Sequence, residues 1–205
     1  MTEKEKMLLG KIYDSSDVEL LKLRQNAHKL SEDYNKTYEI EEEKRSAILK
    51  DLIPSQGEGL YLQGPIHFDY GHFTSFGKNC YANFNLTVLD CAPVSIGDNV
   101  FFGPNCSLVT PIHPLLNEER MPRKKPDGST YILEYAKPIT IKSGSWFATN
   151  VTVCGGVTIG ENCVIAAGSV VTHDIPPNSL AAGVPCRVIR TLTDADRLKK
   201  DLFAE

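Results

Sequence analysis

The sequence predicts a β-solenoid preceded by a helical segment. From residue 60 onward helix-forming residues thin out, and β-branched residues, Gly and Asn become frequent. A period of six residues then dominates, which fits neither a helix of about 3.6 residues per turn nor the alternation of an ordinary strand. It fits a short strand and a turn per repeat, with three repeats closing one coil. In the longest run, a bulky apolar residue stands at every sixth position: Ile141, Phe147, Val153, Ile159, Ile165 and Val171.

Residues 1–58 have a helical character. The stretch "SDVE", Ser16 to Glu19, has the spacing of a capping box, and apolar residues follow it at helix-like intervals. A second helix is expected from about Glu41 to Leu52, and the Pro and Gly residues of "IPSQGEG" end it. We expect this segment to form a small helical cap on the solenoid.

The solenoid is expected over residues 59–190. The period slips by two residues after Val88 and resumes at Ile96. The Gly and Asn residues in the repeats suit turns with positive φ. A small or medium residue lies four positions after each bulky one, and Cys80, Cys106 and Cys163 fall there, so we interpret them as core residues. Coils would stack about 4.8 Å apart through hydrogen bonds between parallel strands.

A long loop, residues 109–138, interrupts the repeats. It displays one histidine, His113, between Pro111 and Pro114. Each proline restricts the backbone around it, so the histidine sits on a stiffened stretch. Insertions in solenoids commonly map to a binding face. After the repeats, residues 191–205 are expected to form a short helix that caps the open end, because an uncovered end exposes unpaired strand edges.

Composition limits the function classes. The formal net charge of −4 argues against a nucleic-acid surface, which is usually basic. No run of 18 apolar residues exists, and the N-terminus lacks the apolar core of a signal peptide. We therefore predict a cytoplasmic protein with neither nucleic-acid nor membrane partners. The cysteine spacing fits no zinc pattern, so no metal is expected.

The ordered motifs resemble one enzyme family. They are "HFDYG" (67–71), "NCYANFNLTVLD" (79–90), "VSIGDNVFFGPN" (94–105), the His-Pro pair, "EYAKPITI" (134–141) and "IPPNSLAAGVPCRVIR" (175–190). Together with the helical N-terminus they resemble the hexapeptide-repeat acyltransferases, within them the maltose/galactoside O-acetyltransferase group. The resemblance implies a left-handed parallel β-helix and a homotrimer with acetyl-CoA bound between neighbouring prisms. It also implies acetyl transfer to a sugar hydroxyl (maltose, glucose or a galactoside) by direct attack, without an acyl-enzyme.

The resemblance assigns catalytic roles to two residues. His113 matches the general base, and an imidazole titrating near ~6.5 suits that role. Asn83 matches the asparagine beside the reacting centre, although a purely structural corner role is the alternative. Glu134 is our candidate for orienting His113; a surface pair with Lys137 is its alternative.

Substrate-binding candidates follow from the same resemblance. Asp69 and Asp90 suit sugar hydroxyls, and Asp14 and Asp17 are expected to reach over from the helical segment. Cys91 stands where the galactoside enzymes carry a second acid. The coenzyme A candidates, in which His173 replaces a frequent lysine and the arginines would face phosphates, are Trp146, Ala148, Thr149, Ala167, Thr172, His173, Arg187 and Arg190.

Three other functions remain open at this point. A transferase of the same fold can act on serine or a xenobiotic instead of a sugar. A zinc lyase with the same solenoid would use histidines, for which His67, His72 and His113 offer superficial candidates. A scaffold solenoid would need no base at all. We expect His28, His67 and His72 to be structural.

Overall fold

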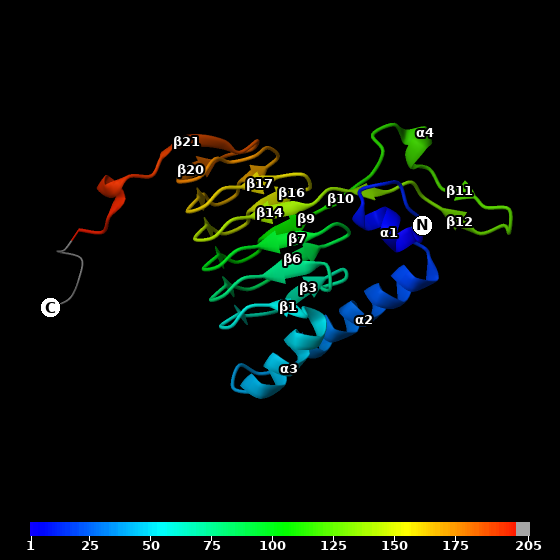
Figure 1. Cartoon of the computed structure of the whole chain (residues 1–205), viewed down its shortest axis with the longest axis horizontal. Helices are drawn as coiled ribbons and strands as arrows, with labels where there is room; N and C mark the ends of the chain where they lie inside the picture. Colours follow the sequence, from blue (N-terminus) through cyan, green and yellow to red (C-terminus); the bar gives the residue numbers. More distant parts are fainter. Residues whose placement is uncertain (200–205) are drawn as a thin grey trace.

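The computed structural model, which describes residues 1–199, confirms a parallel β-solenoid with helices at its N-terminal end (Figure 1). Successive coils contribute one short strand to each of three sheets, which form the faces of the prism. The first sheet contains β1 (Ser55–Gln56), β4 (Thr74–Phe76), β7 (Val94–Ile96), β14 (Ile139–Ile141) and β17 (Thr158–Ile159). The second contains β2 (Tyr61–Leu62), β5 (Tyr81–Ala82), β8 (Phe101–Phe102), β15 (Trp146–Phe147), β18 (Val164–Ile165), β20 (Ser179–Ala182) and β21 (Arg187–Thr191). The third contains β3 (Ile66–Phe68), β6 (Leu86–Leu89), β9 (Ser107–Val109), β16 (Thr152–Cys154) and β19 (Val170–Val171).

The predicted repeat residues form the core of the prism. Every bulky repeat position from Phe76 to Val171 is at most 4% exposed. Consecutive coils stack them directly, as the rings of Phe102 and Phe147 show with centroids 4.8 Å apart. Cys80, Cys106 and Cys163 are buried among them, which confirms their interpretation as core residues.

Asparagines make many of the prism corners. Seven of them have φ between 54° and 63°: Asn79, Asn85, Asn99, Asn105, Asn150, Asn162 and Asn178. Asparagine tolerates this left-handed conformation better than most residues with a Cβ atom. The corner side chains also join neighbouring coils, since Asn85 Nδ2 donates to Asn105 Oδ1 at 2.8 Å.

The helical segment contains α1 (Glu3–Leu8), α2 (Val18–Asn35) and α3 (Glu42–Leu52), so the second predicted helix is confirmed within one residue. The predicted cap of α2 was displaced by one residue. Asp17, not Ser16, accepts the N–H of Glu19 at 2.9 Å, because the Ser16 hydroxyl donates instead to Asp14. The helices cover the first coils (Figure 1), where Arg45 donates to the carbonyl of Leu62 at 2.7 Å.

The loop forms small elements of its own. It contains β10 (Pro111–Ile112), α4 (Asn117–Arg120), β11 (Arg123–Lys124), β12 (Thr130–Tyr131) and β13 (Tyr135–Ala136). β10 pairs with β13 and β11 pairs with β12, both antiparallel. The loop therefore leaves the prism as a paired ribbon beside α1 (Figure 1).

The C-terminal end of the prism is covered by a strand. β21 runs antiparallel to β20 and pairs along its outer edge. The helix predicted for residues 191–205 is not seen in its described part, where a 3-10 turn at Asp194–Asp196 follows β21; residues 200–205 lie outside the described residues. Within residues 1–199, no helix is long and apolar enough to cross a membrane. The cytoplasmic location stays a prediction.

We predict that Asn105→Ala lowers the free energy of unfolding by roughly 1–2 kcal/mol, because alanine resists the left-handed conformation that residue 105 adopts. Asn105→Gly loses the same bond with Asn85 but takes this φ freely, so it should lose less. Urea unfolding at one protein concentration measures both. Equal losses in the two variants would contradict the importance of the backbone conformation.

Candidate active site

The turns that join the second sheet to the third stack in register. The Asn83 N–H donates to the Phe102 carbonyl at 2.9 Å, and the Gly103 N–H donates to the Phe147 carbonyl at 2.7 Å. Asn83, Gly103 and Ala148 therefore lie one above another, in a column that we call the groove corner. A groove of about 870 Å³ runs over it. Its lining includes the predicted residues Asn83, Trp146, Ala148 and Thr149.

Asn83 is not one of the corner asparagines with positive φ. The left-handed residue of its turn is Asn85. The Asn83 side chain accepts the N–H of Phe84 through Oδ1 at 2.8 Å, and its Nδ2 has no hydrogen-bond partner in the described part of the chain. A purely conformational role therefore does not account for Asn83, and a free amide donor lies at the groove.

Several groove residues were missed from the sequence. They are Tyr81, Phe101, Phe102, Gly103 and Pro104. Their signal is the repeat itself, because Phe101 to Pro104 occupy the positions of Trp146 to Thr149 one coil earlier. Gly103 has a steric reason to be glycine: a Cβ atom there would lie 2.8 Å from the carbonyl carbon of Ala148. The small residue keeps the floor of the groove flat.

The other coenzyme A candidates lie in three different parts of the structure: on the groove corner, after β19 and on β21. Ala167 lies on the groove corner one coil beyond Thr149, whose carbonyl accepts the N–H of Gly168 at 2.9 Å. Thr172 and His173 follow β19, at the end of the third-sheet strands that lies away from the groove corner. Arg187 and Arg190 are exposed on β21.

Arg190 already has a partner in the chain. It makes two hydrogen bonds to the carboxylate of Asp196, at 2.8 and 2.5 Å. These bonds lower the pKa of Asp196 to about 2. Arg187 instead donates to the carbonyl of Cys186 at 2.9 Å, so its guanidinium carries no ion pair within residues 1–199.

The turns that follow the third sheet form a second column, the loop corner. Asp69, Leu89 and Val109 lie in it, because β3, β6 and β9 pair in parallel register up to these residues. The long loop leaves the prism here. Pro111 pairs with Ala136 and Ile112 with Tyr135, so this register places His113 opposite Glu134. His113 is exposed and Glu134 is buried.

Glu134 is held by the N-terminal segment. The Tyr13 hydroxyl donates to Glu134 Oε1, and the Tyr13 N–H donates to the Glu134 carbonyl at 3.1 Å. Burial, together with nearby Cys91 and Glu134, raises the pKa of Tyr13, which keeps the hydroxyl a donor. Within residues 1–199 Glu134 has no hydrogen bond to His113 and no ion pair with Lys137, so the strand register is what links it to the histidine.

Asp69 and Cys91 lie at the base of the loop corner. The Cys91 thiol donates to Asp69 Oδ2 at 3.6 Å, and Asp69 Oδ1 lies 3.6 Å from His28 Nε2. Asp69 is partly exposed and can meet a ligand, but Cys91 is 4% exposed. Burial raises the pKa of Cys91, so its thiol stays neutral. Cys91 is therefore too buried for the predicted direct contact with an acceptor, and its thiol instead contacts Asp69.

The prediction that Asp90 binds sugar hydroxyls is wrong for this structure. Asp90 is fully buried, with Oδ1 accepting the Tyr70 N–H at 2.8 Å and Oδ2 accepting the Thr74 hydroxyl at 2.9 Å. The two-residue slip after Val88 turns this carboxylate inward, where it holds the turn. Burial raises its pKa.

Asp14 and Asp17 also have structural partners. Asp17 caps α2. Asp14 forms an ion pair with Lys125 from the loop and accepts the Ser16 N–H at 2.9 Å. Burial raises the pKa of Asp14, but the hydrogen bonds from Lys125 and Ser16 outweigh it and hold the pKa below its usual range. Both carboxylates thus have partners in the chain, and Asp14 connects the N-terminal segment to the loop. Their contact with an acceptor stays a prediction.

One chain does not bring His113 and Asn83 together. The groove corner and the loop corner lie at opposite ends of the strands of the third sheet, where β6 and β9, with four and three residues, span roughly 10–13 Å. Among residues 1–199 no group of three or more His, Cys, Asp or Glu side chains is arranged to hold a metal ion.

Comparisons with known proteins place this architecture. Residues 6–57 match the maltose acetyltransferase hexapeptide capping motif, residues 138–173 match the bacterial transferase hexapeptide (six repeats), and residues 93–113 match the hexapeptide repeat of succinyl-transferase. The galactoside O-acetyltransferase of Escherichia coli (strain K12) is 41% identical over 193 residues, which cover 94% of this chain and 91% of that protein. The chain belongs to this acetyltransferase family.

Solved structures of this acetyltransferase family agree over nearly the whole chain. A maltose O-acetyltransferase from Clostridium difficile 630 is 42% identical with a TM-score of 0.87, covering 95% of this chain and 99% of that one. A galactoside acetyltransferase in complex with coenzyme A is 40% identical with a TM-score of 0.89, covering 100% and 99%. A hexapeptide-repeat acetyltransferase from Vibrio cholerae, complexed with acetyl coenzyme A, is 35% identical with a TM-score of 0.82, covering 95% and 100%.

We predict that Asp90→Ala lowers the free energy of unfolding by roughly 2–4 kcal/mol, because it leaves the Tyr70 N–H and the Thr74 hydroxyl without a partner in the core. Asp90→Asn keeps an acceptor oxygen for Tyr70 and should lose less than half as much. Urea unfolding measures both. If Asp90→Asn instead keeps full stability and raises the KM of a sugar acceptor tenfold, the structural role is contradicted.

Proposed function

We propose that this protein transfers the acetyl group of acetyl-CoA to a hydroxyl of a sugar such as maltose, glucose or a galactoside. The observation that carries the proposal is the pairing of a flat, small-residue groove headed by Asn83 with a loop that presents His113 opposite a buried carboxylate. The relatives named for galactoside and maltose O-acetylation, which match nearly the whole chain, support the same activity.

The groove corner fits a thin, extended cofactor. Gly103 and Ala148 leave its floor without bulky side chains, and Trp146, 50% exposed, forms an apolar wall. Bound there, acetyl-CoA supplies an activated thioester. The Asn83 Nδ2 group would donate to the negative charge that develops on the thioester carbonyl oxygen.

His113 is the proposed general base. Its imidazole would accept the proton of the attacking sugar hydroxyl, and Glu134, opposite it across the β10–β13 pair, would keep the ring oriented. Glu134 is itself fixed by the Tyr13 hydroxyl. Attack of the hydroxyl oxygen on the thioester carbonyl forms the sugar ester and breaks the carbon–sulfur bond, and the proton held by His113 passes to the departing CoA sulfur, so no acyl-enzyme is needed. This agrees with the cysteines, whose pKa values burial raises, so that none is a ready nucleophile.

A homotrimer would complete the site. The groove corner and the loop corner lie at opposite ends of the strands of one sheet. A cyclic arrangement of copies can therefore set the groove corner of one copy beside the loop corner of the next. The coenzyme A candidates divide in the same way, with Ala148 and Ala167 on one corner and Thr172 on the other. The exposed rings of Phe101 and Trp146 on the second sheet offer an apolar surface next to that junction.

We predict that purified protein releases free thiol from acetyl-CoA when glucose, maltose or a galactoside is added. His113→Ala should lower kcat by about 10²–10⁴-fold, because it removes the base and leaves the groove intact. Thiol release measures both. His72→Ala, which removes an exposed histidine outside the groove and the loop, is the matched control and should keep wild-type kcat.

Two results would overturn this proposal. Thiol release only with serine or chloramphenicol would replace the sugar by another acceptor. A His113→Ala enzyme within a few-fold of wild-type kcat would remove the histidine from the mechanism.

We predict that two inactive variants restore each other's activity when mixed. His113→Ala and Asn83→Ala subunits, unfolded together and refolded at equal concentrations, should recover about a quarter of wild-type activity, since about one interface in four joins an intact His113 to an intact Asn83. The measurement is thiol release by the mixed sample compared with each variant refolded alone. A mixture as inactive as its parents would mean that each site lies within one chain.

A further inference from the structure

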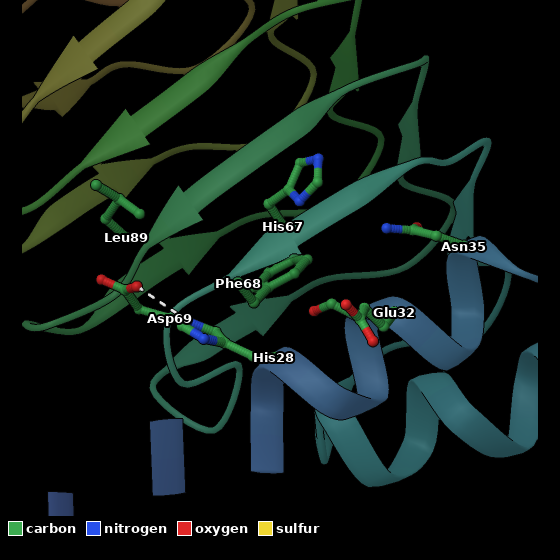
Figure 2. Close-up of a pocket in the computed structure, with 8 residues that line it drawn as sticks. His28, Glu32, Asn35, His67, Phe68, Asp69 and Leu89 are labelled. Carbon is green, nitrogen blue, oxygen red and sulfur yellow. Dashed lines mark ion pairs between the residues drawn. The ribbon is translucent and has the colours of Figure 1, made fainter. Parts of the chain in front are cut away.

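A separate cleft of about 340 Å³ lies between α2 and the outer face of β3 (Figure 2). His28, Ser31 and Glu32 line it from one face of α2, where residues three and four apart are neighbours. His67 and Asp69 line it from the strand side. Figure 2 shows the His28 side chain extending from α2 to Asp69, with which it makes an ion pair across the cleft.

Ser31 is the chemical anomaly of this cleft. It is 4% exposed, and its Oγ is the one buried side-chain polar atom in residues 1–199 without a hydrogen-bond partner. Buried polar groups in folded proteins are nearly always hydrogen-bonded. Ser31 lines the cleft, so a change of its χ1 rotamer can bring the buried hydroxyl to a polar ligand bound there.

The other groups of the cleft both donate and accept. The Glu32 carboxylate is exposed, and its one ion-pair partner in the described chain is Lys36, at 3.4 Å. The His67 imidazole has no hydrogen-bond partner in that part of the chain, while Phe68 and Leu89 supply apolar atoms to the wall. Carboxylates accept hydroxyl protons, imidazoles do either, and apolar atoms suit the C–H face of a sugar ring.

Charge narrows the ligand class. Two carboxylates, Glu32 and Asp69, face the cleft, so they would repel a phosphate or another anion. His28 already pairs with Asp69 at 3.6 Å, and no metal-holding cluster exists among the described residues. A neutral ligand rich in hydroxyl groups fits best.

The cleft shares two residues with the loop corner, from which the His113 loop leaves the prism. Asp69 and Leu89, which line it, belong to the loop corner, and Leu89 pairs in register with Val109, where the His113 loop begins. Coils are about 4.8 Å apart, so the cleft lies one or two coils below the base of that loop. The cleft therefore lies within about 10 Å of the base of the His113 loop, a separation that one sugar unit can bridge.

We propose that this cleft is a second acceptor subsite, which binds the non-reacting sugar unit of a di- or oligosaccharide while the first unit lies at His113. The inference rests on the proposed sugar O-acetyltransferase function. The volume is near the lower end of ligand pockets, about 300–1,000 Å³, so the subsite takes a single ring. Glu32 and Ser31 hydrogen-bond its hydroxyls, and Phe68 and Leu89 contact its apolar face.

The test compares each monosaccharide with its disaccharide, glucose with maltose and galactose with lactose. In the wild-type enzyme, kcat/KM should be higher for at least one disaccharide than for its monosaccharide. Glu32→Gln and Ser31→Ala should each lower that ratio, by about tenfold for Glu32→Gln, because a neutral amide oxygen replaces a charged acceptor and makes a weaker hydrogen bond. Asp33→Asn is the matched control, since it removes a neighbouring carboxylate of α2 outside the cleft and should leave the ratio at its wild-type value.

Calorimetry without acetyl-CoA makes the binding test independent of turnover. Maltose or lactose should bind wild-type protein more tightly than its monosaccharide, and Glu32→Gln should abolish the difference. Equal affinities and equal kcat/KM values for both sugars of each pair would overturn the subsite, even if sugars are acetylated. Tight disaccharide binding that depends on Glu32, without acetylation of any sugar, would instead keep the subsite and overturn the proposed function.

Discussion

The structure depends on a backbone constraint, the left-handed turn that lets each coil of three short strands close. Asparagines at positive φ make seven of these turns, and pairs such as Asn85 and Asn105 join one turn to the next. Once the turns repeat, the strands of successive coils fall into parallel register, and their hydrogen bonds keep the coil spacing constant. Side chains that stand at equivalent positions then stack into straight columns. Both halves of the candidate site are such columns.

The same constraint explains why the site is divided. Gly103 and Ala148 form a flat floor because equivalent turn residues must stack closely, and a Cβ on Gly103 would collide with the coil above. The His113 loop can leave the prism only at a turn between two sheets, and it leaves at the loop corner, at the opposite end of the third-sheet strands from the groove corner. A rigid prism cannot bend these two edges together. Their distance is therefore fixed by the length of the strands in one sheet, and the proposed site would need a second copy to bring His113 to the groove.

The sequence predicted best what the repeat controls. Buried side chains recur with the same six-residue period as the apolar residues of the sequence, so the core from Phe76 to Val171 could be predicted from that period. The groove residues Asn83, Ala148 and Thr149 were predicted from the resemblance to the family. Predictions failed where the period is interrupted. The two-residue slip after Val88 points the Asp90 side chain into the core. The positions of acidic residues in the sequence do not predict this orientation. The edge of the last coil is covered by an antiparallel strand, β21, because a strand can satisfy the open hydrogen bonds of β20 directly.

The N-terminal segment does more than cover the first coils. Tyr13 fixes Glu134 behind His113, and Asp14 pairs with Lys125 near the tip of the loop, so the segment and the loop are tied at two points. Its second helix also supplies one wall of the cleft through Ser31 and Glu32. By contrast, the groove over Gly103 and Ala148 is built from repeat residues alone. The contacts that would select an acceptor thus lie in the N-terminal segment, whereas those that would hold the cofactor lie in the repeats. Acceptor contacts can therefore change without disturbing the stacked coils that form the cofactor groove.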